Sequence, residues 1–257
     1  MLICTNELHQ ILNDPNLLLI DARSFKEYSQ GHIPGAVNLD VFAYHWFDTS
    51  NAGMQAFNAQ SKELFSFVGV TNEKKVVFYD DVSGILASRG VWELLYFSHA
   101  QVFMLDGGIT KWKSENLPIE NKSNEFKPAK FSGKINTDIF AGFEYIRDNL
   151  KNLKIIDARS KEEYDGKVVR AAKRGHIPGS VNVDWIFNVN RDGTLKNEQE
   201  LSKLYQFSKD DEIVTYCHGA YRAANTFVAL KKNGFKNVRV YLGSWGEWGN
   251  KLELPVE

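Results

Sequence analysis

The segment LIDARS at residues 19–24 recurs almost unchanged as IIDARS at residues 155–160. A second block, GHIPGAVN at residues 31–38, recurs as GHIPGSVN at residues 175–182. A repeat with so long a period is a duplicated domain and not a short solenoid unit. The 257-residue chain is therefore expected to consist of two related halves, and its length suffices for two domains of ordinary size.

A polar stretch joins the two halves. Residues 120–128 read ENKSNEFKP, a composition typical of an exposed linker. We therefore predict a first domain at residues 1–120, a linker at residues 121–128 and a second domain at residues 129–257.

Short apolar runs alternate with helical patterns in each half. Strands are expected at residues 17–21, 75–80 and 102–105 and, in the second half, at 153–157, 212–216 and 238–242. Helices are expected at residues 85–97, 198–207 and 222–233. Nearly continuous apolar strands between helices indicate a parallel sheet covered on both faces. The predicted fold class is α/β, with two tandem domains that each contain a parallel sheet flanked by helices.

The composition argues against two classes of partner. The chain has 31 Lys and Arg against 32 Asp and Glu, a formal net charge of −1. This balance favours neither a nucleic acid nor an anionic membrane surface as a partner. The hydrophobic content is 43% and the charged content 25%, as in soluble globular proteins, and no apolar run approaches the ~20 residues of a membrane span.

The two cysteines, Cys4 and Cys217, bear on the cellular compartment. A secreted protein of this size more often carries a paired set, and the N-terminus lacks the basic and apolar regions of a signal peptide. We therefore expect a cytoplasmic location. A Cys4–Cys217 disulfide remains an alternative, although a reactive thiol at Cys217 opposes it.

Cys217 lies at the point where a predicted strand hands over to a predicted helix. It follows the apolar run IVTY at residues 213–216, and Arg222 begins the next helical pattern. The first N–H groups of a helix have no partner within the helix and the dipole there is positive, so the site favours a thiolate. The alternative is a buried core cysteine. Gly219, which would let the loop curl, and Arg222 favour the reactive thiol.

The loop after Cys217 is the predicted anion-binding site. Its residues His218, Gly219, Ala220 and Tyr221 would offer backbone N–H groups, and Arg222 would bind the anion or hold the loop. His218 either modulates the thiolate or is an exposed loop residue without a role, and Tyr221 is expected to line the mouth of the pocket. No metal-ligand spacing, phosphate loop or dinucleotide fingerprint is present, so we predict no cofactor and no metal.

The duplication provides an internal comparison, because a residue present in both halves is expected to hold the fold. Asp157 ends a strand and can cap the next turn, and Arg159 can brace loops through bidentate hydrogen bonds. His176 is interpreted as a hydrogen-bonded turn residue. All three recur in the first half, as Asp21, Arg23 and His32.

The first half lacks the nucleophile. Its corresponding stretch, VVFYDDVSG at residues 76–84, has an acid in place of the thiol and no arginine beyond the loop. We interpret this half as a scaffold that shapes one wall of the pocket.

The second half carries an insertion. Residues 161–174 separate its two repeated blocks, whereas residues 25–30 do so in the first half, an excess of eight. The inserted region contains Lys167, Arg170, Lys173 and Arg174. It is either a solvated basic loop or a source of cations, Arg170 and Arg174 above all, that bind an anionic substrate.

These blocks together resemble the rhodanese sulfurtransferases in their tandem-domain form, over essentially the whole chain. The motifs that carry the resemblance are DAR and GHIPG in both halves, LDGG at residues 105–108, Trp112 and the Cys217 loop. The resemblance implies an inactive first domain and a catalytic second domain in which Cys217 carries sulfur as a persulfide. The loop CHGAYR at residues 217–222 is similar to that of bacterial members with a Cys-x4-Arg pattern. Related phosphatases enclose five residues, so a phosphatase is disfavoured.

The resemblance also implies the reaction. We expect sulfane sulfur to move from thiosulfate to cyanide or a thiol. A 3-mercaptopyruvate sulfurtransferase and a non-enzymatic persulfide carrier or binding module are the alternatives. The family often has a substrate-binding arginine where Glu163 stands here, which weakens a carboxylate-binding pocket of the mercaptopyruvate kind. The expected partners are a small anionic sulfur donor, a thiol or cyanide acceptor and, as a third option, a protein acceptor.

Overall fold

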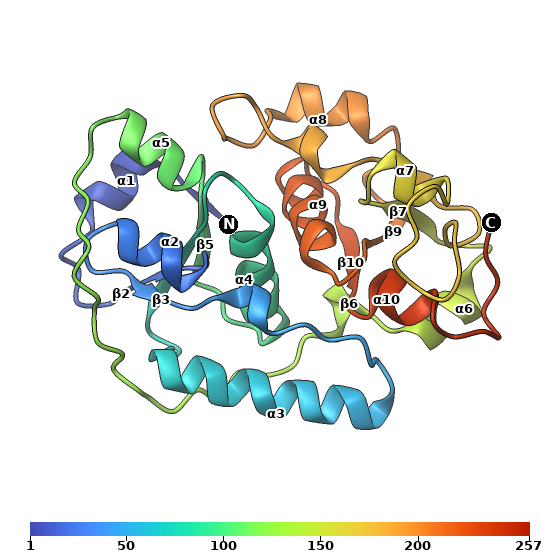
Figure 1. Ribbon diagram of the computed structural model, residues 1–257, viewed down its shortest axis with the longest axis horizontal. Coiled ribbons are helices and arrows are strands. Elements are labelled where there is room, and N and C mark those ends of the chain that lie inside the picture. Colours follow the sequence, from blue (N-terminus) through green and yellow to red (C-terminus); the bar gives the residue numbers. More distant parts are fainter. The chain divides into compact units, whose positions relative to one another are not determined.

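The chain forms two compact units, each built around one sheet, in a computed structural model that describes all 257 residues (Figure 1). Unit 1 comprises Met1–Tyr44, Phe57–Asn136 and Val189–Leu195, and unit 2 comprises His45–Ala56, Thr137–Asn188 and Lys196–Glu257. Each half of the duplicated sequence therefore lends a short segment to the unit built mainly from the other half. The predicted linker at residues 121–128 lies within unit 1.

Unit 1 contains a parallel sheet with the strand order β1-β5-β4-β2-β3. Successive side chains of a strand point to opposite faces. Val77 and Tyr79 therefore pack in a core with α1, α2 and α5, whereas Phe78 packs on Gly90 of α4. The strands are β1 (Leu2–Ile3), β2 (Leu17–Asp21), β3 (Val37–Asn38), β4 (Lys75–Tyr79) and β5 (Val102–Leu105). The helices are α1 (Thr5–Gln10), α2 (Phe25–Gln30), η1 (Val41–Ala43), α3 (Asn51–Val68, in this unit from Phe57 onward), α4 (Ile85–Tyr96) and α5 (Gly108–Ser114).

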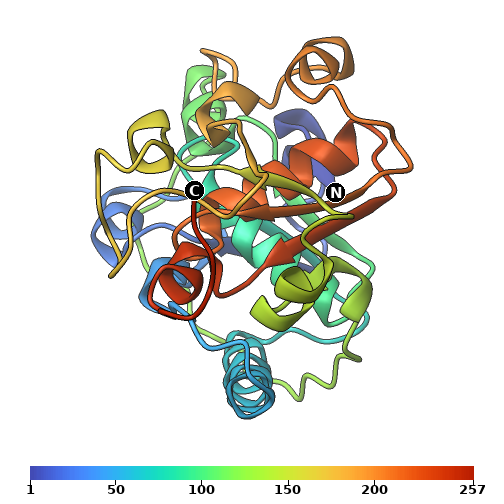
Figure 2. The ribbon, with the colours of Figure 1, turned by 90° about the vertical axis from the view of Figure 1, so that its right-hand side faces the viewer.

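Unit 2 repeats this plan with the strand order β6-β10-β9-β7-β8, again all parallel. Val214 and Tyr216 pack in a core with Trp245 and Trp248 of α10, while α9 contacts β9 and β10. The strands are β6 (Phe140–Ala141), β7 (Lys154–Asp157), β8 (Val181–Asn182), β9 (Glu212–Tyr216) and β10 (Asn237–Tyr241). The helices are η2 (Thr137–Ile139), α6 (Phe143–Asn149), α7 (Lys161–Tyr164), η3 (Trp185–Asn188), α8 (Glu198–Leu204), α9 (Tyr221–Lys232) and α10 (Ser244–Trp248). Figures 1 and 2 show each sheet with its helices from two directions.

The predicted fold class is confirmed, since both units are parallel sheets flanked by helices. The six predicted strands are found with bounds that agree to within one residue at each end. The strands β1, β3, β6 and β8 were not predicted, because two residues are too few to show a periodic pattern. Helix α3 was also not predicted. No helix, α3 included, is long and apolar enough to cross a membrane.

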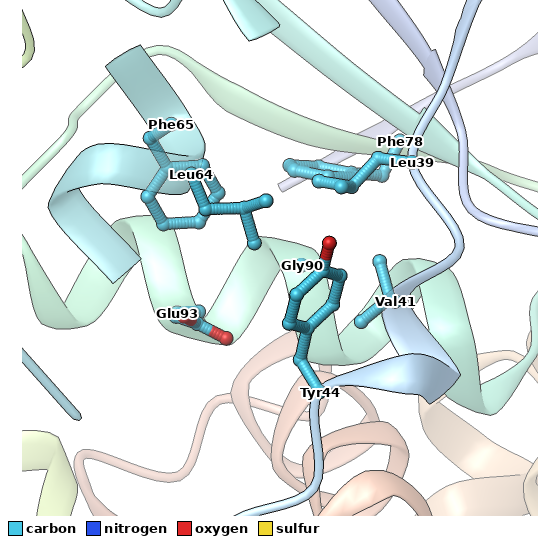
Figure 3. A pocket seen from close by; sticks show the side chains of 8 residues that line it. All are labelled: Leu39, Val41, Tyr44, Leu64, Phe65, Phe78, Gly90 and Glu93. Atoms are coloured by element: carbon cyan, nitrogen blue, oxygen red, sulfur yellow. The ribbon is translucent and has the colours of Figure 1, made fainter. Parts of the chain in front are cut away.

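A small cavity lies in unit 1 between α3, α4 and the segment around η1 (Figure 3). Tyr44 points its hydroxyl group toward the cavity, and the other lining residues include Leu64, Phe65 and Phe78. Its volume of about 10 Å³ is room for about one water molecule. This cavity is too small to hold a substrate, and the residues singled out by sequence lie elsewhere.

Candidate active site

Cys217 is the first residue after β9, at the carboxyl end of a central strand of unit 2. It is 1% exposed and its thiol is free. Its backbone is held on both sides: the amide donates to the Ser244 hydroxyl at 3.2 Å, and the carbonyl accepts from the Trp245 amide at 2.9 Å. The residue is buried beside a hydroxyl and a guanidinium group and not among hydrocarbon side chains alone.

The loop turns at a residue other than the one predicted. Ala220, with φ +68°, adopts the left-handed conformation, whereas Gly219 does not have a positive φ. The expectation that Gly219 supplies the backbone freedom is therefore wrong. Gly219 is instead a point of close approach: a Cβ there would lie 3.2 Å from the ring of Phe47 and 3.3 Å from that of His45. Helix α9 begins at Tyr221, one residue before the predicted start.

The buried Ser244, at the start of α10, is hydrogen-bonded to this loop. Its hydroxyl accepts hydrogen bonds from the amides of Cys217 and Ala220, at 3.2 and 3.1 Å, and donates to the Tyr241 carbonyl at 2.8 Å. The Ala220 amide is therefore engaged within the protein. The amides of His218, Gly219 and Arg222 make no hydrogen bond with another protein group.

Sequence reasoning missed Ser244, although a signal was present. The pair Gly243-Ser244 stands where the first half has Gly107-Gly108. Both Ser244 and Gly108 have a positive φ, +52° and +56°. A serine in a conformation that favours glycine, found only in the half that contains the thiol, indicates that its hydroxyl is needed there.

Arg222 is held by a buried carboxylate. Its guanidinium donates to both oxygens of Glu163, at 2.5 and 3.1 Å. Burial lowers the pKa of Arg222, but hydrogen bonds to Glu163 and the interaction with Cys217 outweigh it and hold the pKa above its usual value. The group is therefore a permanent cation that faces the Cys217 side chain.

Of the two predicted arginines of the insertion, only Arg170 joins this group. Its Nε lies 3.4 Å from a Glu163 oxygen, and its charge also acts on His218. Arg174 packs instead against Gly166, and no contact links it to Cys217. Lys173, expected in a basic loop, hydrogen-bonds the carbonyls of Lys251 and Leu254 and so ties the insertion to the C-terminal segment.

Aromatic side chains cover the loop. The ring of Phe47 lies 5.7 Å from that of His218, and the ring of His45 lies 5.0 Å from that of Tyr221. Tyr221 is 4% exposed. Burial of the His218 ring, together with the charge of Arg222, lowers the pKa of His218. His218 is therefore neutral at pH 7, and its Nδ1 is buried without a hydrogen-bond partner.

The segment that carries Phe47 and His45 is anchored within unit 2 at Thr49. The Thr49 amide and hydroxyl both donate to the Glu247 carboxylate, at 2.9 and 2.6 Å. Nothing in the local pattern of residues 45–49 predicted this position, because it depends on a contact between residues far apart in the chain.

The three residues expected to give structural support make the same contacts in both units. Arg159 forms a bidentate pair with Asp157 and donates to the Gly175 carbonyl at 2.8 Å, and Arg23 does the same with Asp21 and Gly31. The His176 ring stacks on Tyr164 and pairs through Nδ1 with the Tyr164 carbonyl at 3.0 Å. His32 makes the equivalent contacts with Tyr28. The structural role of Asp157, Arg159 and His176 stays a prediction, and these shared contacts are the observations that support it.

The counterpart of Cys217 in unit 1 is Asp80. Tyr79 pairs with Asp21 in the same register in which Tyr216 pairs with Asp157. The Asp80 carboxylate accepts hydrogen bonds from three backbone amides at the start of α4, at 2.9 to 3.1 Å. Unit 1 therefore fills its own loop with a carboxyl group.

Comparison with known proteins points to one family. The model for "Rhodanese-like domain" matches residues 5–115 and 143–251. The thiosulfate sulfurtransferase of Azotobacter vinelandii is 34% identical over 260 residues, 98% of this chain and 94% of that protein. The sulfur carrier protein TtuD of Thermus thermophilus is 29% identical over 277 residues, 100% of this chain and 96% of that protein.

A solved structure agrees with this result. SseA, a 3-mercaptopyruvate sulfotransferase from Escherichia coli, has a TM-score of 0.80 and 29% identity, with 95% of this chain and 98% of that one covered. The named sulfurtransferases among these proteins support sulfur transfer as the class of reaction.

Proposed function

Since the chain belongs to the family of rhodanese-like domains, we propose that it is an enzyme that moves a sulfane sulfur from thiosulfate to a thiol or to cyanide through a persulfide on Cys217. The observation that supports this most is the placement of the Cys217 thiol just before the N-terminus of α9, with the Arg222 side chain against it. Catalysis through a covalent intermediate requires an activated nucleophile of this kind.

The first half-reaction forms the persulfide. The Cys217 thiolate attacks the outer sulfur of thiosulfate, a new S–S bond forms, and the S–S bond of thiosulfate breaks. Sulfite leaves with the electron pair of the broken bond. The terminal persulfide sulfur then carries one negative charge, which the Arg222 guanidinium, the start of α9 and the amides of His218 and Gly219 would stabilise.

The second half-reaction returns the free enzyme. A thiolate or cyanide attacks the terminal sulfur, and the electron pair of the persulfide bond returns to the Cys217 Sγ. The products are a new persulfide or thiocyanate. Because donor and acceptor react in separate steps, ping-pong kinetics are expected.

Thiosulfate is proposed over 3-mercaptopyruvate as the donor because Glu163 stands where the family often has a substrate-binding arginine. A carboxylate at this position offers no cation to the carboxylate of 3-mercaptopyruvate. The similarity to SseA keeps 3-mercaptopyruvate as the second candidate. The values of kcat/KM for the two donors separate these options.

The test is mass spectrometry of the protein after treatment with thiosulfate, followed by cyanide. Wild-type protein should gain about 32 Da on the Cys217 peptide and lose it as thiocyanate forms. The C217S variant should lose thiocyanate formation by on the order of 10³-fold or more, whereas C4S, which changes an exposed cysteine, should keep it. Retained activity in C217S would overturn the mechanism.

The same experiment distinguishes an enzyme from a carrier. A persulfide carrier would load one sulfur for each Cys217 and release it without rapid turnover, and one relative is named a sulfur carrier protein. Repeated turnover with excess thiosulfate and cyanide supports the enzyme.

A further inference from the structure

Glu163 both caps a helix and binds Arg222. It lies at the third position of α7 and completes a capping box with Ser160: its carboxylate accepts from the Ser160 amide and its amide donates to the Ser160 hydroxyl, both at 3.3 Å. The same carboxylate binds the Arg222 guanidinium through two hydrogen bonds and lies 3.4 Å from Arg170. Its side chain is only 5% exposed.

The first half shows which role is the basic requirement of the fold. Glu27 completes the same capping box with Ser24, and no ion pair joins it to an arginine. No arginine stands at the start of α4, where Arg222 stands at the start of α9. The helix cap therefore needs the side-chain oxygen alone, and the contact with Arg222 is an addition of the second half.

The charge of Glu163 matters to the site. Burial raises its pKa, but the hydrogen bonds and charge of Arg222, with Ser160 and Arg170, outweigh burial, so the pKa lies below its usual value and the group is ionised at pH 7. Glu163 and Cys217 both interact with the Arg222 guanidinium, so the carboxylate and the sulfur share one cation. A bidentate pair fixes the plane and direction of a guanidinium that otherwise rotates about several bonds.

We propose that Glu163 is a positioning residue, which holds the Arg222 guanidinium against the Cys217 sulfur and limits the net charge of the site to that of one cation. This proposal rests on the proposed sulfur transfer and deepens it. Arg222 and Arg170 supply two positive charges and Glu163 one negative charge. Glu163 thus lowers the affinity of the site for anions, but it orients the Arg222 guanidinium that stabilises the persulfide.

The variant E163Q separates these effects. Glutamine keeps an oxygen that can serve the cap, but it cannot accept both hydrogen bonds from Arg222 as a charged group does. With thiosulfate as donor, kcat should fall about tenfold because the guanidinium is no longer oriented. The KM for thiosulfate should not rise and should fall about two- to threefold, because the site gains one net positive charge.

Two variants serve as controls. E27Q changes the same capping position in the half without the thiol and should leave kcat and KM at the wild-type values. E163D keeps the charge but shortens the side chain by one methylene, so kcat should fall as in E163Q while KM does not fall. E163D also keeps the test decisive if E163Q proves too unstable to purify.

Single-turnover sulfur loading distinguishes a failure of this proposal from a failure of the proposed function. If wild-type protein gains no sulfur on Cys217, sulfur transfer itself is refuted. If wild-type protein loads and both Glu163 variants load at the wild-type rate with an unchanged kcat, the positioning role is refuted. Slower loading in both variants, with E27Q unaffected, supports it.

Discussion

The loops after β4 and β9 are two versions of one design. In unit 1 the residue after β4 is Asp80, whose carboxyl group accepts hydrogen bonds from three amides at the start of α4. In unit 2 the residue after β9 is Cys217, and the amides of His218, Gly219 and Arg222 are left without a protein acceptor. The comparison shows that both loops offer backbone amides as an anion site. The side chain of the residue after the strand decides whether the chain itself fills that site.

The second difference lies in what surrounds the loop. Unit 2 adds Arg222 and Ser244, for which unit 1 has no counterpart with a charge or a hydroxyl group. Ser244 holds the Cys217 backbone, and Arg222 faces its side chain. Reactivity is therefore built by a few polar additions to a shared scaffold, and each addition can be removed singly.

Replacement of Arg222 should have the largest effect. In R222K a single ammonium group replaces the planar guanidinium group. The lysine therefore cannot bind both Glu163 oxygens and face Cys217 at once. We expect kcat for thiosulfate to fall about a hundredfold. Steady-state kinetics measures this, and R147K, on the exposed Arg147–Asp148 pair, serves as the control. A wild-type kcat in R222K would show that catalysis does not depend on the guanidinium group that distinguishes the loop of unit 2 from that of unit 1.

Removal of the Ser244 hydroxyl should lower stability. In S244A the amides of Cys217 and Ala220 lose their buried acceptor, at a cost of about 2 kcal/mol. In S244G the loss should be about 1 kcal/mol smaller, because glycine accepts the positive φ without strain. Urea unfolding of both variants checks the order. Equal stability of S244A and wild type would show that this hydroxyl is dispensable.

Asp80 should make the stability depend on pH. Burial, with a smaller effect from the charge of Asp81, raises the pKa of Asp80 from 3.8 to about 7, although hydrogen bonds from three backbone amides oppose this. Between these two values the folded protein binds more protons than the unfolded chain, so stability falls as pH rises through this window. The slope from this one group should be at most about 1.4 kcal/mol per pH unit.

The variant D80N tests this dependence because it has no titrating group at that position. Its free energy of unfolding should vary less steeply between pH 4.5 and pH 7 than that of the wild type. Urea midpoints at several pH values give the comparison. Parallel curves for the two proteins would show that Asp80 does not carry a buried proton.

Much of this protein follows from its sequence alone. The duplication, the six longer strands and the place of Cys217 after a strand are local patterns, and such patterns appear wherever neighbouring residues determine the conformation. The recurrence of Asp157 and Arg159 in the other half also indicates shared scaffold contacts, because a residue kept in both halves serves what the halves have in common.

Tertiary structure alone decided the rest. The pairing of Glu163 with Arg222, the hydroxyl of Ser244 under the Cys217 loop and the approach of Phe47 to Gly219 join residues far apart in the chain. No periodicity records such contacts, because they depend on how strands order in a sheet and where connections return. The identity of the nucleophile is therefore a local property of the sequence, whereas the arrangement that orients charge around it exists only in the folded chain.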